Sequence, residues 1–480
     1  MAQTIMIDPV TRIEGHLAVE VEVDGGKVVN AKSMGMMFRG LELILKGRDP
    51  RDAAQLTQRI CGVCPVTHAT ASSLALDNAF GIEPPPNGRL IRNLILGSNF
   101  VQSHILHFFH LAALDYVKGP DIPPFTPRYE GDYRFPADVN QQVVATYLKA
   151  LQMRRKAHEM TALWGGKMPH QQAIVPGGVS EVPDSQKIAE FLFRLQELQT
   201  FINNEYIPTV KAVAETYPDY WNIGRGCMNF LVYGGFPLEE GMDHVSKQKL
   251  FPSKVYVNGQ LADLDIEVIN EAVKYSWYED DTGGTKPTEA VVKPNTAKKG
   301  AYSFIKAPRY NGAPMEVGPL ARMYVMGEET VTQLGEKAFS VLGRHLARAL
   351  ECSMVAKAMG SWVTELEIGQ PVCTPHKIPD SAQGVGLNEG PRGALGHWNR
   401  IEHQRTAIYN AIVPTTWNLS PRDDNDQMGP MEQALIGTPV ADPDNPVEVV
   451  RIIRSFDPCL ACAIHLMTPD QQTISRCQIG

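Results

Sequence analysis

The sequence predicts a mixed α+β fold that is mainly helical, with a long central helix bundle and α+β portions at the ends of the chain. Long stretches in the middle of the chain space their apolar residues at helical intervals. Near the N-terminus and again near the middle, apolar and polar residues alternate around Asp-Gly and Asn-Gly pairs, which predicts β-hairpins. The 480 residues include 40 Gly and 35 Pro without a repeat period, which indicates many loops rather than a solenoid.

The first predicted elements lie on either side of a pair of cysteines. Residues 16–32 predict a hairpin. Residues 48–62 predict one helix, with Asp49 as its cap and Gly62 as its stop. Residues 66–81 predict a second helix. The first cysteine pair is therefore expected at a junction between two helices.

The middle and the end of the chain are predicted as follows. Long helices are expected over residues 90–117, 141–164, 185–217 and 335–366. The first of these is apolar almost all round, which marks a buried helix, and the next two are more amphipathic. Between them and the last, residues 254–265 predict a second hairpin, and the polar, Gly/Pro-rich residues 277–300 predict a surface excursion. Strands and turns around residues 390–398 and a short helix over 445–456 then lead to a second cysteine pair.

The composition argues against several classes of protein. The net charge is −8 and the basic residues are scattered, so we expect no nucleic-acid partner. No apolar run has the length of a membrane span. The N-terminus lacks a basic segment followed by an apolar one, so we expect no signal peptide on this chain. Because a chain of this length can bury a large core, its eight cysteines fit metal or redox chemistry better than a disulfide framework.

Two short motifs predict a metal site. "RICGVCPVTH" contains Cys61, Cys64 and His68, and "DPCLACAIH" contains Cys459, Cys462 and His465. Cysteines three apart in a turn can direct both thiolates to one point, so two such turns together would form a four-thiolate site that joins opposite ends of the chain. Four thiolates hold structural zinc, and they also suit reactive transition metals. Because so large a chain does not need a zinc ion for stability, we interpret the motifs as a reactive metal site. Structural zinc and two unrelated pairs of buried thiols are the alternatives.

The histidines allow simpler interpretations than metal binding. His68 and His465 are also suited to capping turns or donating to nearby carbonyls. His104, His107 and His110 lie at spacings of three on one predicted helix, as a second metal site would require. Such a row more often consists of core histidines bonded to neighbouring polar groups, and we interpret it so.

These motifs, taken together, resemble a known family. The two cysteine motifs, "DPVTRIEGH" near the start, "FRGLE" before the first pair and "GPRGALGHW" late in the chain resemble the large subunit of [NiFe]-hydrogenases. The resemblance runs from about Ile7 to His465, with the motifs in the family's order. A related subunit of respiratory complex I lacks the four cysteines that this chain has. The resemblance therefore implies the [NiFe]-hydrogenase large-subunit fold.

The resemblance implies a nickel–iron centre held by the four cysteines. Cys61 and Cys459 would bind nickel alone, and Cys64 and Cys462 would bridge nickel and iron, whose other ligands are CO and cyanide made by other proteins. Around the centre, Arg392 matches the arginine that donates to a cyanide and polarises H2, with Pro391 beside it. Thr415 matches the hydroxyl that binds the other cyanide, and Asp457 is placed to orient Arg392. An ion pair for Arg392 and ordinary packing for Thr415 are the alternatives.

Further residues match family positions outside this shell. Glu14 matches a proton-relay glutamate, the alternative being a salt bridge with Arg12. A separate Mg²⁺ or Fe²⁺ site is implied by Glu42 and His465 with the backbone carbonyl of Ala411. His68 is implied as a hydrogen-bond donor to a bridging thiolate.

The chain departs from most of the family at one motif. Gln102-Ser103-His104 stands where most members have His-Asp-His, so the aspartate that assists Arg392 there is missing. The surrounding residues instead resemble the selenium-containing branch, which carries selenocysteine at the position of Cys459. Either the chain is a cysteine relative of that branch, or a recoded codon is written as Cys.

We therefore expect a hydrogenase that cleaves H2 reversibly and heterolytically, with the proton passing to Cys459 and then to Glu14. The remaining cysteines are single residues without the spacing of an Fe–S site: Cys227, Cys352, Cys373 and Cys477. The chain therefore has no electron path of its own, and the family's Fe–S small subunit would supply one. The alternative is a non-catalytic metal-binding scaffold related to the complex I subunit.

The resemblance also implies how the chain matures. Residues 1–465 would form a single catalytic unit, and residues 466–480 a C-terminal extension that an endopeptidase removes after nickel-insertion proteins have acted. A plain surface tail is the alternative. The selenium branch implies a periplasmic enzyme, either free or associated with the membrane, that is exported with a signal on its small subunit.

Overall fold

The computed structural model describes residues 2–123, 125–128, 131–243 and 245–463. Its helices are α1 (Leu41–Leu45), α2 (Ala53–Leu56), α3 (Pro65–Phe80), α4 (Pro86–Ile105), α5 (Ala137–Gly165), α6 (Ser185–Phe201), α7 (Ile207–Thr216), α8 (Pro319–Val325), α9 (Glu329–Gln333), α10 (Val341–Thr364), α11 (Pro414–Asn418), α12 (Pro430–Leu435), α13 (Val447–Ser455) and α14 (Leu460–Ala463). None of the helices in these ranges is long and apolar enough to cross a membrane.

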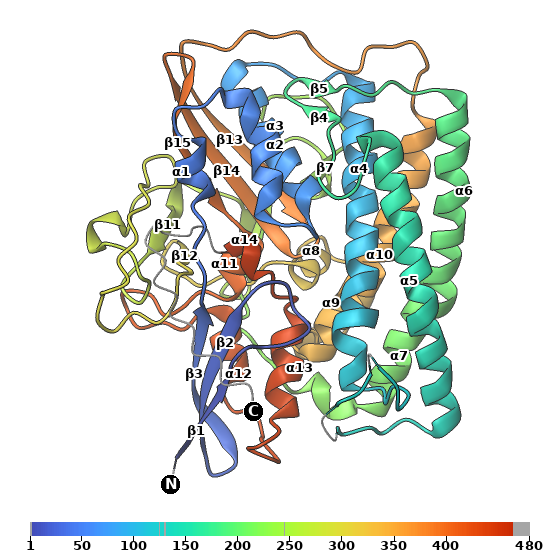
Figure 1. Cartoon of the computed structure of the whole chain (residues 1–480), viewed down its shortest axis with the longest axis vertical. Helices are drawn as coiled ribbons and strands as arrows, with labels where there is room; N and C mark the ends of the chain where they lie inside the picture. Colours follow the sequence, from blue (N-terminus) through green and yellow to red (C-terminus); the bar gives the residue numbers. More distant parts are fainter. Residues whose placement is uncertain (1, 124, 129–130, 244, 464–480) are drawn as a thin grey trace.

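The strands are short in the middle of the chain and longer at its two ends. They are β1 (Gln3–Ile7), β2 (Leu17–Asp24), β3 (Lys27–Gly35), β4 (Ile174–Val175), β5 (Gly178–Val179), β6 (Phe230–Val232), β7 (Gly235–Pro237), β8 (Lys249–Phe251), β9 (Lys254–Val257), β10 (Gln260–Asp263), β11 (Ile269–Ala272), β12 (Ala307–Tyr310), β13 (Ser381–Gly390), β14 (Gly393–Glu402) and β15 (Arg405–Ile412). The arrangement confirms the predicted helix bundle with α+β portions at the ends (Figure 1).

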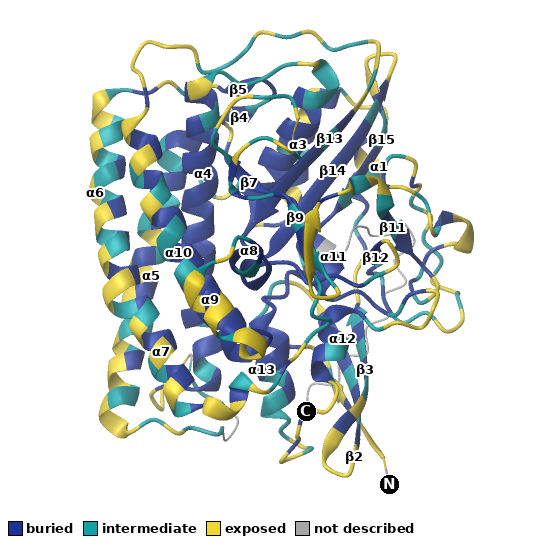
Figure 2. Cartoon of the chain, turned by 180° about the vertical axis from the view of Figure 1, so that it is seen from behind, coloured by how far each residue is buried: buried dark blue, intermediate teal, exposed yellow. Residues whose placement is uncertain are grey.

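A bundle of long helices forms one side of the molecule (Figure 1). Helix α4 is buried along almost its whole length and packs against α5 and α10, while α6 covers α5 and α10 from outside. Figure 2 shows the consequence: α4 is dark blue, whereas the outer faces of α5 and α6 are exposed. The all-round apolar pattern of residues 90–117 is thus explained by burial on every side.

The other side of the molecule is built on the antiparallel sheet β13-β14-β15, which α3 covers (Figure 1). The helix approaches the sheet closely because β13 carries glycine where the two meet. A Cβ placed on Gly386 would lie 2.0 Å from the backbone oxygen of Ala71 in α3. The sheet therefore fixes α3, whose first turn follows the first cysteine pair.

The two ends of the chain lie side by side. The N-terminal sheet has the order β1-β2-β3. Its strand β3 is joined to the C-terminal part by hydrogen bonds from Ser33 N to Glu432 Oε1 (2.9 Å) and from Val28 N to Thr438 O (3.0 Å). These contacts bring helix α13, and the cysteine pair after it, next to the N-terminal segment.

Most of the predicted elements are confirmed. The hairpins predicted over 16–32 and 254–265 are β2–β3 and β9–β10. The helix predicted over 66–81 is α3, and that over 445–456 is α13.

The single helix predicted over 48–62 is wrong. Asp49 caps as expected, but the segment consists of a 3₁₀ turn, the four-residue α2 and a second 3₁₀ turn, Thr57–Ile60. The side chains of Thr57 and Gln58 each donate to the carbonyl four residues earlier, at 2.7 and 3.0 Å. The tightened turn ends in an extended Cys61, which an uninterrupted helix would have pointed elsewhere.

Other predicted boundaries differ because of local interruptions. The helices predicted over 90–117 and 185–217 each contain a π-helical turn, Leu106–Ala112 and Ile202–Tyr206. The last long helix begins at Val341 with Ser340 as its cap, after a separate 3₁₀ turn. Residues 277–300 form an exposed excursion as predicted, although Asn410 of β15 anchors it by donating to two of its carbonyls, at 2.7 and 2.8 Å.

Replacing Gly386 by Ala tests the packing of α3 on β13. The added methyl group meets backbone atoms of Ala71 and Ala75 in α3, and overpacking of this kind costs about 1–3 kcal/mol. We expect a clearly lower apparent Tm by calorimetry. The control is Gly360→Ala in α10, whose Cβ would meet only ordinary contacts at 3.8 Å. Equal Tm values for the two variants would contradict the close approach.

Candidate metal centre

The first cysteine pair is held by the loop between two helical segments. Cys61 ends the Thr57–Ile60 turn in an extended conformation, and Cys64 immediately precedes Pro65, the first residue of α3. Between the cysteines, the carbonyl of Val63 accepts hydrogen bonds from Asn99 Nδ2 (3.0 Å) and Gln102 Nε2 (2.8 Å) of α4. The buried helix therefore fixes the loop that carries both thiols.

The second pair begins a short helix after a sharp turn. Asp457, which precedes Pro458, has a positive φ of 56°, and this turns the chain away from α13. The backbone N–H of Cys459 donates to Thr415 Oγ1 of α11 at 3.1 Å. Cys462 lies in α14, one turn further on. The turn and the bond from Thr415 set the direction of both thiols.

The four sulfurs meet in the core. Sγ atoms are 3.3 Å apart for Cys61 and Cys459, 3.2 Å for Cys64 and Cys462, and 3.0 Å for Cys459 and Cys462. All four lie within 4.8 Å of one another, none is in a disulfide, and each residue is at most 7% exposed. The structure therefore assembles the predicted four-thiol cluster from residues nearly 400 positions apart in the chain.

Residues from the N-terminal segment join the two cysteine loops. Arg39 Nη2 donates to Ala461 O at 2.8 Å and also to Ile60 O, so one guanidinium contacts both loops. Gly15 lies so close to α14 that a Cβ there would be 2.7 Å from Ala461 N. Both residues belong to motifs that carry the family resemblance, but nothing in the sequence pattern indicates these contacts.

Glu14 lies against Cys459. The Cys459 thiol donates to Glu14 Oε2 at 3.3 Å, and the same oxygen accepts from Ala461 N at 2.9 Å. Burial raises the pKa of Glu14, and the negative charge of Cys61 adds to the rise. The alternative of a salt bridge between Glu14 and Arg12 is wrong, because Arg12 pairs with Asp115. The geometry allows a proton to pass between a cysteine sulfur and a carboxylate.

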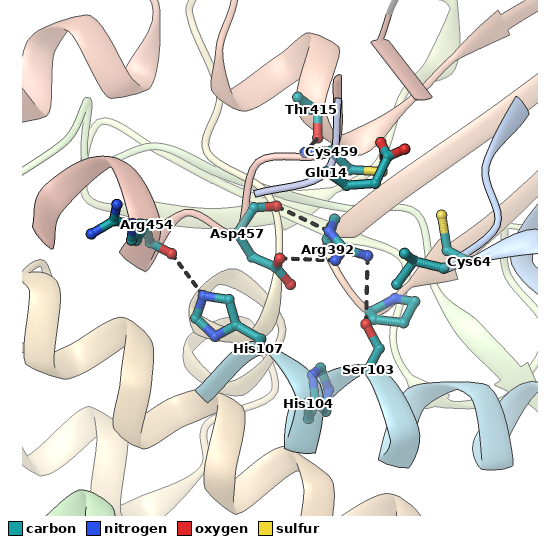
Figure 3. A network of polar contacts seen from close by, with 12 residues as sticks. Glu14, Cys64, Ser103, His104, His107, Arg392, Thr415, Arg454, Asp457 and Cys459 are labelled. Atoms are coloured by element: carbon teal, nitrogen blue, oxygen red, sulfur yellow. Dashed lines mark hydrogen bonds and ion pairs between the residues drawn. The ribbon is translucent and has the colours of Figure 1, made fainter. Parts of the chain in front are cut away.

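Arg392 lies over the cluster on the tight turn between β13 and β14 (Figure 3). Its Nε donates to Asp457 O at 3.0 Å, and its Nη2 forms an ion pair with Asp457 Oδ1 at 2.9 Å. Its Nη1 is 3.5 Å from Ser103 Oγ, a contact at the limit of a hydrogen bond. The ion pair is too bent to count as a hydrogen bond, so the buried Nη2 has no hydrogen-bond acceptor among the described residues.

The charge of the cluster is unevenly shared. The pKa of Cys61 is well below its usual range, first because the thiols of Cys459, Cys462 and Cys64 donate to it, and also because Arg392 is near. Burial raises the pKa of Cys459 and of Cys462. Since four buried thiolates repel one another, all four ionise together only when a cation joins them. The donor set thus fits a soft metal, including nickel, iron or zinc.

The residues predicted for a second metal site are only partly described. Glu42 lies in α1, and Ala411 lies in β15, on which α1 packs. Burial raises the pKa of Glu42 to about 7. His465, the third predicted ligand, lies outside the described residues. His68 lies in α3 one turn after Cys64, with its Nδ1 3.2 Å from Nε2 of His397.

The row of histidines on α4 and on the π-helical turn that follows it does not form a second cluster. His104 Nε2 contacts Glu351 Oε1 at 2.8 Å, His107 Nε2 contacts Arg454 O at 2.7 Å, and His110 Nε2 contacts Tyr147 O at 3.2 Å. His104 and His107 are buried and His110 is half-buried, so the row consists of histidines bonded to neighbouring polar groups, as interpreted from the sequence. Within the described ranges, the four-cysteine cluster is the one grouping with metal-ligand geometry, and Cys227, Cys352 and Cys373 lie outside it. Cys477 lies beyond the described residues.

Comparison with known proteins identifies the family. A family model described as nickel-dependent hydrogenase matches residues 39–122 and 117–465. The chain belongs to the nickel-dependent hydrogenase family. A second model, described as HoxL-like, matches residues 4–34. The fold of this hydrogenase and the position of its four cysteines therefore support a Ni–Fe centre rather than structural zinc.

This hydrogenase matches known large subunits over almost the whole length of both chains. The periplasmic [NiFeSe] hydrogenase large subunit of Desulfomicrobium baculatum is 45% identical, covering 96% of this chain and 95% of that protein. The Hydrogenase-2 large chain of Escherichia coli K12 is 35% identical, covering 98% of both. The solved Ni-Fe-Se hydrogenase of D. vulgaris Hildenborough in the reduced state has a TM-score of 0.93 at 46% identity, covering 97% of this chain and 100% of that chain.

These findings settle the class of the protein. The chain is a hydrogenase large subunit with the large-subunit fold, and so an oxidoreductase acting on H2, as the sequence predicted. The alternative of a non-catalytic scaffold related to complex I has no support among them.

Replacing Cys459 by Ser tests the cluster. The change exchanges a soft sulfur for a hard oxygen, so we expect loss of most of the nickel and of H2 uptake. Elemental analysis and an H2-uptake assay measure the two. Cys373→Ser is the control, because Cys373 lies outside the cluster and its thiol faces backbone carbonyls. Wild-type nickel content in Cys459→Ser would refute the assignment.

Proposed function

We propose that this subunit cleaves H2 reversibly and heterolytically at a Ni–Fe centre whose protein ligands are the four cysteines. Cys61 and Cys459 would hold nickel, and Cys64 and Cys462 would bridge nickel and iron. When bound, the centre, with CO and cyanide on iron, supplies the site of H2 cleavage and takes up the two electrons. The observation that carries the proposal is the meeting of four buried sulfurs with one carboxylate and one guanidinium.

Glu14 is the proton acceptor in this proposal. It is the carboxylate in contact with the Cys459 sulfur, at 3.3 Å, and the N–H of Ala461 holds its oxygen in place. Burial raises its pKa, so this carboxylate takes up a proton more readily than one in water would. The proton released on cleavage passes from Cys459 to Glu14 and then outward.

Arg392, Thr415 and their neighbours orient the ligands of iron. The Nη2 group of Arg392 is buried beside the cluster without a hydrogen-bond acceptor among the described residues, and we assign it to a cyanide and to the polarisation of H2. Pro391 shapes the turn that carries it, and Asp457 holds its charge. The Thr415 oxygen already accepts from Cys459 N–H, so its hydroxyl hydrogen is assigned to the other cyanide.

Two further roles complete the site. We assign His68 as a donor to a bridging thiolate, since it lies one turn after Cys64 and its Nδ1 faces His397. We assign Glu42, the carbonyl of Ala411 and His465 to a Mg²⁺ or Fe²⁺ ion. A bound cation would stabilise the buried carboxylate of Glu42, whose pKa is otherwise raised to about 7.

The electrons need a partner chain. Large-subunit relatives imply a heterodimer with a small subunit, and we assign the Fe–S clusters to that partner, because the described part of this chain has no cysteine group besides the Ni–Fe ligands. The relative from D. baculatum is described as periplasmic. We infer the same location here, either free or associated with the membrane, with export directed by a signal on the small subunit.

We propose that residues 1–465 are one catalytic unit and that residues 466–480 are removed on maturation. Cys462 is buried in the core and lies three residues before His465 in the chain (465 − 462). An endopeptidase that cuts after nickel insertion would make this docking irreversible.

Glu14→Gln tests the proton relay. The amide keeps the shape of the side chain but cannot carry the proton, so turnover and H/D exchange with solvent should fall about 100-fold or more while nickel content stays unchanged. Isotope exchange by mass spectrometry and metal analysis measure both. Glu22→Gln on strand β2 is the control. Loss of nickel in Glu14→Gln would mean that the residue is structural instead.

Intact-mass measurement tests maturation. We expect the active chain to end at His465, shorter than the 480-residue chain by 15 residues (480 − 465). Nickel-starved cells should accumulate the long form. A full-length chain with full activity would exclude the proposed cleavage.

A further inference from the structure

A second buried guanidinium lies behind the turn that carries Arg392. Arg322 of α8 is fully buried. Its Nη1 donates to Gly390 O at 2.9 Å, and its Nη2 donates to Pro391 O at 3.0 Å. These are the two carbonyls that immediately precede Arg392. Arg322 therefore holds the backbone on one side of the turn, while the Arg392 side chain extends toward the cysteines.

The remaining donors of Arg322 are all occupied by carboxylates. Nε and Nη2 donate to the two oxygens of Glu351 in α10 at 2.7 and 2.6 Å, and Nη1 donates to Glu389 Oε2 at 2.6 Å. An arginine has five N–H groups in a fixed planar fork, and all five are used here. No other side chain can reproduce this set, because lysine has three donors and no fork.

The Glu351 carboxylate that binds Arg322 is itself held in place by a second helix. Glu351 Oε1 also contacts His104 Nε2 of α4 at 2.8 Å. Burial alone would raise the pKa of Glu351, but the charge of Arg322 and the hydrogen bonds from His104 and Arg322 together lower it, so Glu351 stays ionised as the counter-charge. The turn is thus connected through Arg322 to two long helices of the bundle.

The turn needs such support because the other contacts of Arg392 are few. Strand β13 ends at Gly390 and β14 begins at Gly393, so Pro391 and Arg392 alone make the turn. Proline contributes no N–H to fix it. Beyond Asp457, the one polar contact of the Arg392 side chain among the described residues is the 3.5 Å approach to Ser103 Oγ. The position of the guanidinium therefore depends on where the backbone of the turn is held.

We propose that Arg322 is a positioning residue for the hydrogenase reaction, which fixes the Pro391–Arg392 turn and thereby the place of the Arg392 guanidinium over the metal centre. This inference rests on the role proposed above for Arg392. A shift of about 1 Å in a group that acts on the reacting atoms can cost about 100-fold in rate, so a loosened turn has a measurable effect.

Arg322→Lys in the loaded heterodimer is the first test. The charge is kept while at least two of the five hydrogen bonds are lost. We expect turnover to fall about tenfold at unchanged nickel content, with a shift of the infrared cyanide bands in the same direction as in Arg392→Lys. A purely structural role would not move those bands.

Arg92→Lys is the matched control. Arg92 of α4 is also buried, pairs with Asp77 at 2.6 Å, and donates to the backbone carbonyls of Gly178 (3.0 Å) and Val175 (2.6 Å), far in sequence from the turn. We expect turnover within twofold of wild type and unshifted infrared bands. An equal loss in Arg92→Lys would show a general effect of opening a buried arginine network and would overturn the proposal.

A double-mutant cycle with Arg392→Lys decides whether Arg322 acts through Arg392. We expect Arg392→Lys to lower turnover about 100-fold and Arg322→Lys to add nothing further in that background. The same tenfold loss in both backgrounds would mean that Arg322 acts independently, and the inference would be wrong.

The outcomes separate this inference from the proposed role of Arg392. Turnover equal to wild type in Arg392→Lys would contradict the role proposed for Arg392. If turnover is low in Arg392→Lys but equal to wild type in Arg322→Lys, only the inference about Arg322 is wrong. If Arg322→Lys fails to assemble, Glu389→Gln is tested instead, because it weakens one of the hydrogen bonds that hold Arg322. We expect a smaller loss of turnover with the same shift of the infrared cyanide bands. Unshifted bands would overturn the inference.

Discussion

The constraint that the rest of the structure serves is that two cysteine loops from opposite ends of the chain must meet in the core. Cys61 and Cys459 are 398 positions apart, yet their sulfurs lie 3.3 Å from each other in the core. Thiols of raised pKa in such a place stabilise little by themselves, so the fold must bring them together by other means. The side-by-side packing of the N-terminal sheet and the C-terminal helices does this.

The site combines short irregular segments with rigid supports. Three of the reactive groups lie on a loop or a turn: Cys61 after a 3₁₀ turn, Arg392 between two strands, and Cys459 after a positive-φ residue. Loops give access and direction to side chains, but their position must come from the scaffold. Here α4 holds the first cysteine loop through Val63, and Arg39 joins both loops. Arg322 would do the same for the turn of Arg392.

The chemistry of the ligands could be read from the sequence, whereas most of their support could not. Paired cysteines identify themselves by spacing, and long helices and hairpins by periodicity, so the cluster and most elements were predicted. The break in the helix over 48–62 was missed, because the bonds of Thr57 and Gln58 that tighten it leave no periodic signal. The hydrogen bonds of Arg39 and Arg322 join residues that are distant in the chain. The sequence does not indicate which distant residues such an arginine contacts, because these contacts form only in the folded chain.

X-ray absorption at the nickel and zinc edges of the purified heterodimer tests the central claim most directly. If the four cysteines hold a Ni–Fe centre, nickel should be present with sulfur as its main ligand and with one iron neighbour. Four sulfurs around zinc, with no nickel in the active preparation, would contradict the account.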